Sequence, residues 1–177
     1  MKTLVTGVAG FIGSTLAERL VAEGHDVVGL DSFSDYYPRQ IKERNLETLG
    51  KGPRFTFVES TIQSADLTSL LRDRTHVFHL AAQAGVRRSW GRDFAVYTTN
   101  NIEATQVLLE AIAQNSRIER VVYASSSSVY GDNVEMPMKE DALPQPVSPY
   151  GVTKLAAEQL CYLYHVNHGV PTVSLRY

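Results

Sequence analysis

This sequence has only one cysteine, no long apolar run and almost no excess of one charge. A single cysteine in 177 residues excludes a disulfide-stapled scaffold and a cysteine-based zinc site. The 17 Lys and Arg against 19 Asp and Glu leave a formal net charge of −2, which excludes a basic nucleic-acid binder and an acidic disordered tail. The sequence shows neither a membrane-length apolar run nor the pattern of a signal peptide. We therefore expect a cytoplasmic protein that binds neither nucleic acid nor membrane.

The length is sufficient for one domain with a hydrophobic core and too short for two ordinary domains. Apolar runs predict strands at Lys2–Thr6, Asp26–Asp31, Arg54–Glu59, Thr75–Leu80, Arg120–Ser125 and Pro171–Tyr177. Helical periodicity predicts helices at Phe11–Glu23, Pro38–Leu49, Asp66–Leu71, Asp93–Gln114 and Pro149–His168. The proline-rich residues 131–149 are expected to form a surface loop. This alternation predicts an α/β fold of three α/β/α layers, with a doubly wound parallel sheet in strand order 3-2-1-4-5-6.

Three glycines follow the first predicted strand and open the first predicted helix. Gly7, Gly10 and Gly13 form the pattern G-x-x-G-x-x-G. The first glycine permits a tight turn, the second lets the backbone approach a pyrophosphate, and the third lets helix and strand pack closely. The start of the helix then presents free N–H groups to the phosphates. The alternative is an ordinary strand-to-helix turn without a ligand.

An acidic residue, Asp31, closes the second strand 18 residues after Gly13. A dinucleotide-binding fold places a carboxylate about 20 residues after its glycines, where it binds the adenosine ribose hydroxyls. Such a carboxylate repels a 2′-phosphate, and neither Ser32 nor Phe33 supplies a cation to bind one. The pattern therefore favours NAD over NADP. Taken alone, Asp31 is equally typical of a turn or a helix cap.

Tyr150 and Lys154 lie four residues apart at the start of the last long helix, so they share one helix face. A phenol has a pKa of about 10, and a neighbouring ammonium and a cationic nicotinamide both favour its ionised form. That pairing can make Tyr150 a general base. Taken alone, such a pair occurs by chance in many amphipathic helices.

A run of four serines, 125–128, follows the fifth strand, at the sheet edge where parallel α/β sheets bind ligands. A hydroxyl there can hold a substrate oxygen. The alternative is a flexible polar linker, which fits poorly between an apolar strand and Val129-Tyr130-Gly131. No metal site is predicted. His165 and His168 are expected to cap the end of their helix, because no third ligand is evident.

With these motifs in this order, the chain resembles the extended short-chain dehydrogenases/reductases, which have the Rossmann fold. More narrowly, it resembles the NAD-dependent nucleotide-sugar epimerase/dehydratase family, and within it the UDP-glucose and UDP-glucuronate 4-epimerases. The resemblance runs over essentially all 177 residues. It is carried by VTGVAGFIGSTLAERL at 5–20, HLAAQAGVR at 79–87, YASSSSVYG at 123–131 and SPYGVTKLAAEQL at 148–160.

The resemblance implies that Ser126, Tyr150 and Lys154 are the catalytic residues, with Ser127 as the fallback for the serine. The expected cofactor contacts are Gly7, Gly10, Phe11, Ile12, Gly13, Asp31, Ser32, Thr61, Ile62, Leu80, Ala81, Ala82, Gln83, Asn101, Ser125, Tyr150, Lys154 and Tyr177. The expected substrate contacts are Arg87, Arg88, Ser126, Ser127 and Tyr150. For the two arginines, a solvated loop is the open alternative.

Two positions depart from the family pattern. Thr61 stands where the family often has an aspartate that contacts adenine, and Ser32 stands where an asparagine is common. The first change predicts a hydroxyl or backbone contact to adenine in place of a carboxylate. Neither change affects the expected chemistry.

The resemblance implies an isomerase, in which Tyr150 takes the proton of the sugar 4-hydroxyl, Ser126 holds the 4-oxygen and hydride passes to NAD and back. Sugar dehydratases or decarboxylases are neighbouring alternatives. Dehydratases need an acidic pair where this chain has Ser127 and Ser128. A non-catalytic NAD-binding or redox-sensing module is another alternative, disfavoured by the intact Tyr150 and Lys154.

The chain length leads to a further expectation. Family members bind the nucleotide sugar largely through a C-terminal domain that follows the sixth strand. We therefore expect residues 1–177 to be the NAD-binding Rossmann domain without that second domain, able to bind NAD and poor at turnover alone. The resemblance also implies a homodimer through the helices Asp93–Gln114 and Pro149–His168.

Overall fold

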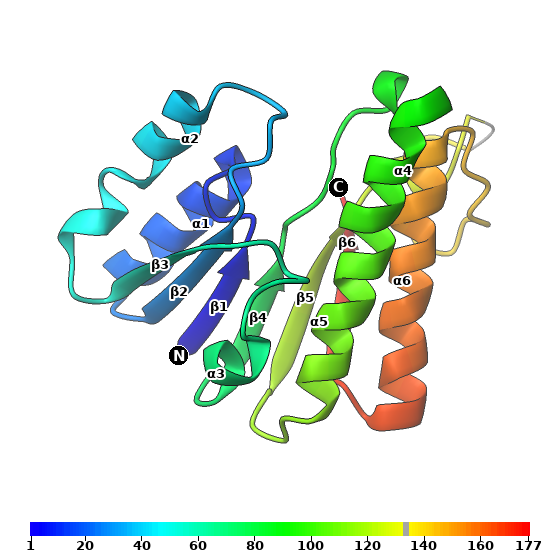
Figure 1. Cartoon of the computed structure of the whole chain (residues 1–177). Helices are drawn as coiled ribbons and strands as arrows, with labels where there is room; N and C mark the ends of the chain where they lie inside the picture. Colours follow the sequence, from blue (N-terminus) through cyan, green and yellow to red (C-terminus); the bar gives the residue numbers. More distant parts are fainter. Residues whose placement is uncertain (133–134) are drawn as a thin grey trace.

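A six-stranded, fully parallel sheet forms the centre of the molecule, in the order β3-β2-β1-β4-β5-β6 (Figure 1). The computed structural model describes residues 1–132 and 135–177. The strands are β1 Lys2–Thr6, β2 Asp26–Asp31, β3 Phe55–Glu59, β4 His76–His79, β5 Arg120–Ser125 and β6 Thr172–Arg176. The predicted strand order is confirmed, and each strand lies within two residues of its predicted bounds.

The α-helices are α1 Phe11–Ala22, α2 Arg39–Leu46, α3 Leu67–Leu71, α4 Phe94–Tyr97, α5 Ala104–Ala113 and α6 Pro149–His168. Short 3₁₀ turns occupy η1 Leu49–Lys51, η2 Arg87–Ser89, η3 Gly91–Asp93 and η5 Ser127–Val129. The described part of the predicted 131–149 loop has no regular element before α6, and residues 133–134 lie outside the description. None of the helices described is long and apolar enough to cross a membrane.

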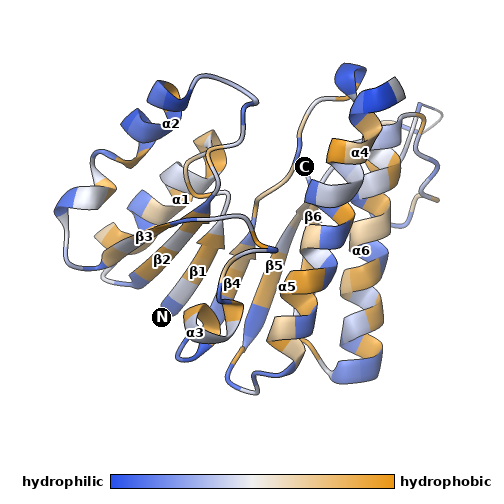
Figure 2. Cartoon of the chain, viewed as in Figure 1, coloured by the Kyte–Doolittle hydropathy of each residue, from blue (hydrophilic) through white to orange (hydrophobic). Residues whose placement is uncertain are grey.

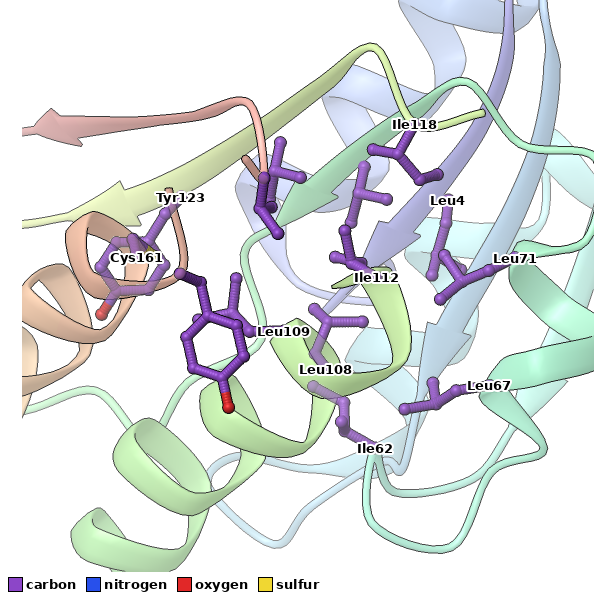
Figure 3. Close-up of a cluster of buried hydrophobic side chains, with 14 of the residues drawn as sticks. Leu4, Ile62, Leu67, Leu71, Leu108, Leu109, Ile112, Ile118, Tyr123 and Cys161 are labelled. Carbon is purple, nitrogen blue, oxygen red and sulfur yellow. The ribbon is translucent and has the colours of Figure 1, made fainter. Parts of the chain in front are cut away.

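Helices cover both faces of the sheet, which confirms the predicted three layers. On one face, α1 and α2 pack over a core that includes Val5, Val27 and Leu20. On the other face, α3, α5 and α6 bury a larger cluster (Figure 3); its labelled members include Leu4, Leu71, Leu108, Ile112 and Tyr123. Colouring by hydropathy shows the apolar residues concentrated along the strands and on parts of the helices (Figure 2). Burial of this apolar surface is the main stabilising contribution.

The predicted helix Asp93–Gln114 is helical throughout but does not have one regular pitch. A π-helical segment, η4 Thr98–Glu103, lies between α4 and α5. Its wider turn carries Asn101 into the interior, where the side chain is buried. π-Segments within α-helices occur frequently at functional sites. Side-chain periodicity does not reveal a π-helical segment, because such a segment shifts the pattern of apolar residues by only a fraction of a turn.

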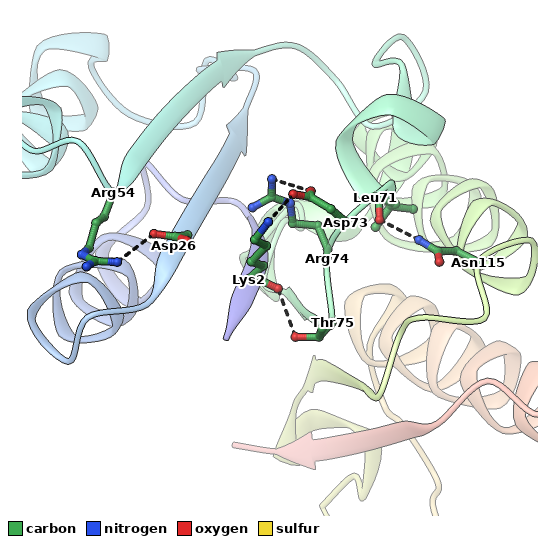
Figure 4. A network of polar contacts seen from close by, with 8 residues as sticks. All are labelled: Lys2, Asp26, Arg54, Leu71, Asp73, Arg74, Thr75 and Asn115. Atoms are coloured by element: carbon green, nitrogen blue, oxygen red, sulfur yellow. Dashed lines mark hydrogen bonds and ion pairs between the residues drawn. The ribbon is translucent and has the colours of Figure 1, made fainter.

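The amino ends of the strands are held by polar contacts that lie opposite the carboxyl-end edge (Figure 4). Asp73 accepts from Lys2 Nζ at 2.8 Å and pairs with Arg74 at 2.7 Å. Asn115 donates to the carbonyl of Leu71 at 2.6 Å, which ties α3 to the turn before β5. Pairs this exposed contribute little stability. The residues predicted to bind the cofactor from β1, β2 and β4 lie at the opposite, carboxyl end of the sheet.

A buried polar chain joins the carboxyl ends of β1 and β4 to α5. His79 has its Nδ1 2.8 Å from Thr6 Oγ1 and its Nε2 2.9 Å from Thr105 Oγ1. Thr6 Oγ1 also accepts the N–H of Ala81 at 3.2 Å. Burial, assisted by the charge of Lys154, lowers the pKa of His79 from 6.5 to about 3. The imidazole is therefore neutral in the folded protein at neutral pH.

His79 should make the fold sensitive to acid. Its pKa is lower in the folded state than in the unfolded state, so its contribution is complete above pH 6.5 and is lost as the pH falls toward 3. At pH 5 the loss is about 2 kcal/mol relative to pH 7. We expect His79→Gln to reduce the fall in unfolding free energy between pH 7 and pH 5 by about that amount, measured by urea unfolding. An equal fall in both proteins would contradict the assignment.

Candidate active site

The strand order reverses between β1 and β4. Open parallel sheets bind ligands outside the carboxyl ends of the strands at such a point, and we call this region the crevice. The glycine turn forms one wall of it. Gly7 has φ +71°, and a Cβ there would lie 2.7 Å from the backbone nitrogen of Ala81. A Cβ at Gly13 would lie 2.2 Å from the carbonyl oxygen of Gly7. Both positions therefore require glycine, which confirms the tight turn predicted at Gly7 and the close helix packing predicted at Gly13. The close approach of Ala81, after β4, was not predicted.

The start of α1 faces the crevice without a side-chain cap. Gly10 is the residue at the helix N-cap, no side chain caps the helix there, and its first turn holds no acidic residue. Phe11 and Ile12 are exposed, and their backbone belongs to this first turn. An uncapped helix start of this kind suits an anionic group such as a pyrophosphate.

Asp31 lies at the end of β2, directly beside the glycine turn. Its Oδ2 accepts the N–H of Ala9 at 3.1 Å, and its Oδ1 accepts the N–H of Phe33 at 2.8 Å. The nearby cation of Arg39 is already engaged, because its guanidinium forms two hydrogen bonds of 2.8 Å with Glu59. The carboxylate is thus fixed at the crevice, and Arg39 is committed to another carboxylate. Both features suit ribose hydroxyls better than a 2′-phosphate.

The chain after β4 forms a segment that hydrogen bonds hold in place, Leu80–Gly85, called the strap here. Asn101 holds Gln83 by both backbone groups: it accepts the N–H at 2.7 Å and donates to the carbonyl at 3.1 Å. The Tyr97 hydroxyl lies 2.9 Å from the carbonyl oxygen of Ala84 and 2.7 Å from that of Gly85. Asn101 also donates to Thr153 Oγ1 at 3.0 Å, which connects the strap to α6. The π-segment therefore serves to bring Asn101 between strap and helix.

Tyr150 enters the crevice from the first turn of α6. Ser148 caps this helix by accepting the N–H of Gly151 at 3.1 Å, and Pro149 occupies the first position. Burial raises the pKa of Tyr150 above 10, and the nearby Ser126 side chain partly opposes that rise. The protein alone therefore does not yield a phenolate here. Additional positive charge is needed to ionise this phenol near neutral pH.

Lys154 lies one turn further along α6 and is almost fully buried. Its Nζ stands 4.5 Å from the centre of the Tyr123 ring. Burial lowers the pKa of Lys154 from 10.5 to about 8, and the Cys161 and Glu158 side chains partly oppose this. A buried ammonium with so low a pKa, aligned with a tyrosine in a crevice, is typical of functional sites.

The serine run separates into different environments. Ser126 Oγ accepts the N–H of Ser128 at 3.1 Å, and Ser126 is the serine close enough to lower the pKa of Tyr150. Ser125 is buried on the α6 side of β5 and donates to Glu158 Oε2 at 2.7 Å. Ser127 donates its N–H to the carbonyl of Tyr177 at 2.5 Å. Of the four, Ser126 is thus the one that the structure brings to Tyr150.

The remaining candidate residues differ in how exposed they are. Thr61 is exposed and accepts the N–H of Ser64 at 3.1 Å, whereas the side chain of Ile62 lies in the core. Tyr177 is exposed at the end of β6. Arg87 and Arg88 are exposed in η2, and the only carboxylate that pairs with either among the described residues is Asp93, 3.9 Å from Arg88. Other candidates are exposed (Ser32, Ala82) or half-buried (Leu80, Ala81).

Two tyrosines lie near the strap, of which sequence reasoning missed Tyr97 and left the role of Tyr36 open. The ring of Tyr97 lies 6.3 Å from that of Tyr150 in an edge-to-face arrangement. Tyr36 reaches the strap from the loop after β2, since a Cβ on Gly85 would lie 3.0 Å from its hydroxyl. From the sequence, Tyr36 is compatible both with flanking the cofactor or substrate and with rim packing, whereas Tyr97 stands in a helical stretch whose pitch the sequence did not reveal. No group of three metal-ligating side chains occurs within the residues that the structure describes.

These elements define a Rossmann-like α/β domain with its crevice at the switch point of the sheet. The sequence model described as "NAD dependent epimerase/dehydratase family" matches residues 3–177. The chain belongs to this family.

Solved structures of the family superimpose closely on the chain. UDP-glucuronic acid 4-epimerase from Bacillus cereus, in complex with UDP-glucuronic acid and NAD, is 48% identical with a TM-score of 0.96, covering 100% of this chain and 56% of that one. UDP-glucose 4-epimerase from Brucella ovis, in complex with NAD, is 34% identical with a TM-score of 0.85, over 99% and 51%. The uncharacterized UDP-glucose epimerase YtcB of Bacillus subtilis is 48% identical over 100% of this chain and 56% of its own length. The chain spans about half the length of the curated relatives it matches.

Proposed function

We propose that residues 1–177 are the NAD-binding part of a UDP-sugar 4-epimerase and carry its catalytic residues. The observation that carries the proposal is that Tyr150 and Lys154 at the start of α6, the uncapped start of α1 and the hydrogen-bonded strap all lie at the carboxyl end of the sheet, with Ser126 following β5 at the same edge. The relatives solved with NAD and with UDP-sugars support it. The serines at 127 and 128 disfavour a dehydratase, which needs an acidic pair there.

The residues fit NAD because the crevice supplies what each end of a dinucleotide needs. The glycine turn and the start of α1 would hold the pyrophosphate, and Asp31 would bind the adenosine ribose. Lys154 would bind the nicotinamide ribose, with the strap and Tyr177 beside the ring. The chemistry supplied by bound NAD is reversible acceptance of the hydride from C4 of the sugar.

In the proposed mechanism, Tyr150 takes the proton of the sugar 4-hydroxyl and returns it to the 4-oxygen when the hydride comes back. Ser126 holds the 4-oxygen by a hydrogen bond throughout. Because burial raises the pKa of Tyr150, its ionisation requires the Lys154 ammonium and the positive charge of the cofactor. Arg87 and Arg88 are proposed to meet the substrate, since both are exposed beside the strap.

Pairing of two copies through the long helices remains a prediction. Both helical runs expose apolar side chains, which supports it: Val96 on α4 and Val152 on α6 are each 46% exposed. A cavity lined by Trp90, Phe94 and Val152 lies between the starts of these two helices.

Comparison of residues 1–177 with the complete protein tests the proposed function. We expect the complete protein to convert UDP-glucose or UDP-glucuronate to its 4-epimer, measured by chromatography of the products, with bound NAD released on denaturation. We expect residues 1–177 to bind NAD and to give little or no epimer. Robust epimerisation by residues 1–177 alone would contradict the division of roles. A complete protein that binds NAD and epimerises neither sugar would contradict the function.

A further inference from the structure

A largely buried ion pair, Glu158 with Arg176, joins α6 to the end of β6. Glu158 stands on α6 one turn beyond Lys154, and its side chain is 11% exposed. Its Oε1 accepts from Arg176 Nε at 3.0 Å and from the Nη2 of the same guanidinium at 2.5 Å. Its Oε2 accepts from Ser125 Oγ at 2.7 Å. The carboxylate therefore binds the last residues of two strands at once.

These two strand ends lead directly into the crevice. Ser125 precedes Ser126, and Arg176 precedes Tyr177, whose carbonyl accepts the N–H of Ser127. Arg176 is itself held on its other sides: its guanidinium lies 4.8 Å from the centre of the Tyr130 ring and donates to the carbonyl of Glu140 at 3.2 Å. Glu158 thus connects the helix that carries Tyr150 and Lys154 to the strand end that carries Ser126.

We propose that Glu158 is a positioning residue, which clamps the ends of β5 and β6 to α6 and is the fixed countercharge of the Lys154 ammonium. The clamp sets the separation between Ser126 and Tyr150. Ser126 directly follows Ser125, which Glu158 binds, and Tyr150 lies on the same helix as Glu158. The role in turnover rests on the proposed function, whereas the clamp and the countercharge are properties of the chain itself. Removal of either Glu158 or Arg176 leaves the other with an uncompensated charge beside Lys154.

The groups that face Lys154 determine the sign of the effect. Among the described residues they are His79 from β4, Tyr123 from β5, and Cys161 and Glu158 from α6. Burial keeps the His79 imidazole neutral and raises the pKa of Cys161 to about 12, so both are uncharged. Glu158 is therefore the group in this set that supplies a negative charge. Its charge favours the protonated lysine, and the guanidinium of Arg176 partly neutralises that charge.

The test follows Lys154 by NMR in the complete protein, with lysine labelled by ¹³C at Cε and the resonance assigned by its loss in Lys154→Met. The lysine of the wild type should titrate near 8. We expect Glu158→Gln to lower this midpoint and Arg176→Met to raise it, because the first removes an anion and the second a cation. Unfolding moves every lysine toward its ordinary value of 10.5, so a lowered midpoint cannot arise from lost structure.

Kinetics of the same variants test the positioning role. Glu158→Gln should reduce kcat about 10–100-fold, with KM for the sugar and NAD content nearly unchanged and with the alkaline limb of kcat at lower pH. Glu110→Gln is the matched control. That carboxylate accepts from Tyr164 of α6 and from Gln106 at 3.1 Å, away from the crevice, so neither the midpoint nor kcat should change.

The outcomes separate the two proposals. An unchanged Lys154 midpoint in Glu158→Gln overturns the countercharge, whether or not the protein is an epimerase. An active enzyme whose kcat is unaffected by Glu158→Gln overturns the positioning role. A protein in which Glu158→Gln lowers the Lys154 midpoint as expected, but which lacks turnover, contradicts the proposed function and leaves the countercharge supported.

Discussion

Tyr150→Phe in the complete enzyme should reduce kcat by about 10²–10⁴-fold, the range typical of a lost general base. The hydroxyl is the atom proposed to carry the proton, and the Ser126 hydroxyl cannot replace it because a serine is a much weaker acid than a phenol. The packing of the ring against Tyr97 remains possible in the variant. NAD content and thermal stability should therefore stay close to those of the wild type, which restricts the effect to turnover.

Tyr162→Phe provides the matched control for this variant. Tyr162 lies on the same helix, and its side chain is 64% exposed. Loss of its hydroxyl should leave kcat within about twofold of the wild type, because surface changes of this kind have small effects. Equal kcat in wild type and Tyr150→Phe, at unchanged NAD content, would remove Tyr150 from the mechanism. Loss of turnover together with loss of NAD would instead assign the hydroxyl to cofactor binding.

Local sequence patterns sufficed to predict the framework of the site. Gly7 and Gly13 each need to be glycine because of backbone atoms that lie within their own βα unit or directly after the adjacent strand β4. The strand order could be predicted because alternating strands and helices have few right-handed arrangements. Tyr150 and Lys154 lie on one helix, so their alignment depends only on helical spacing.

Other parts of the site depend on contacts between distant segments. The π-segment at Asn101 is stabilised by Gln83 and Thr153, which are 18 and 52 residues away in sequence. The clamp at Glu158 depends on residues from two different strands. Ser125 illustrates the same limit, because the serine run predicted only a polar edge. The packing of α6 decides which hydroxyl donates to Glu158 and which lies near Tyr150. Residue type and spacing do not encode those choices.

Gly13→Ala should damage both the fold and the binding of NAD. The added Cβ would lie 2.2 Å from the carbonyl oxygen of Gly7 and 2.9 Å from Val8 Cα, and backbone atoms cannot rotate away. Either α1 or the turn must shift. We expect a loss of about 3 kcal/mol in unfolding free energy, equivalent to about 6–12 °C in Tm, together with loss of NAD binding.

Two other glycines separate these effects. Gly50→Ala adds its Cβ in open space, so stability and NAD affinity should both stay within about 0.5 kcal/mol of the wild type. The Cβ of Gly10→Ala would lie 3.2 Å from the Gly7 carbonyl oxygen, a contact that a small shift relieves. Because Gly10 stands where the pyrophosphate is proposed to approach, this variant should lose NAD affinity with a much smaller loss of stability. If calorimetry shows equal NAD affinity in Gly10→Ala and wild type, the phosphates do not approach at this turn, and the proposed orientation of the cofactor is wrong.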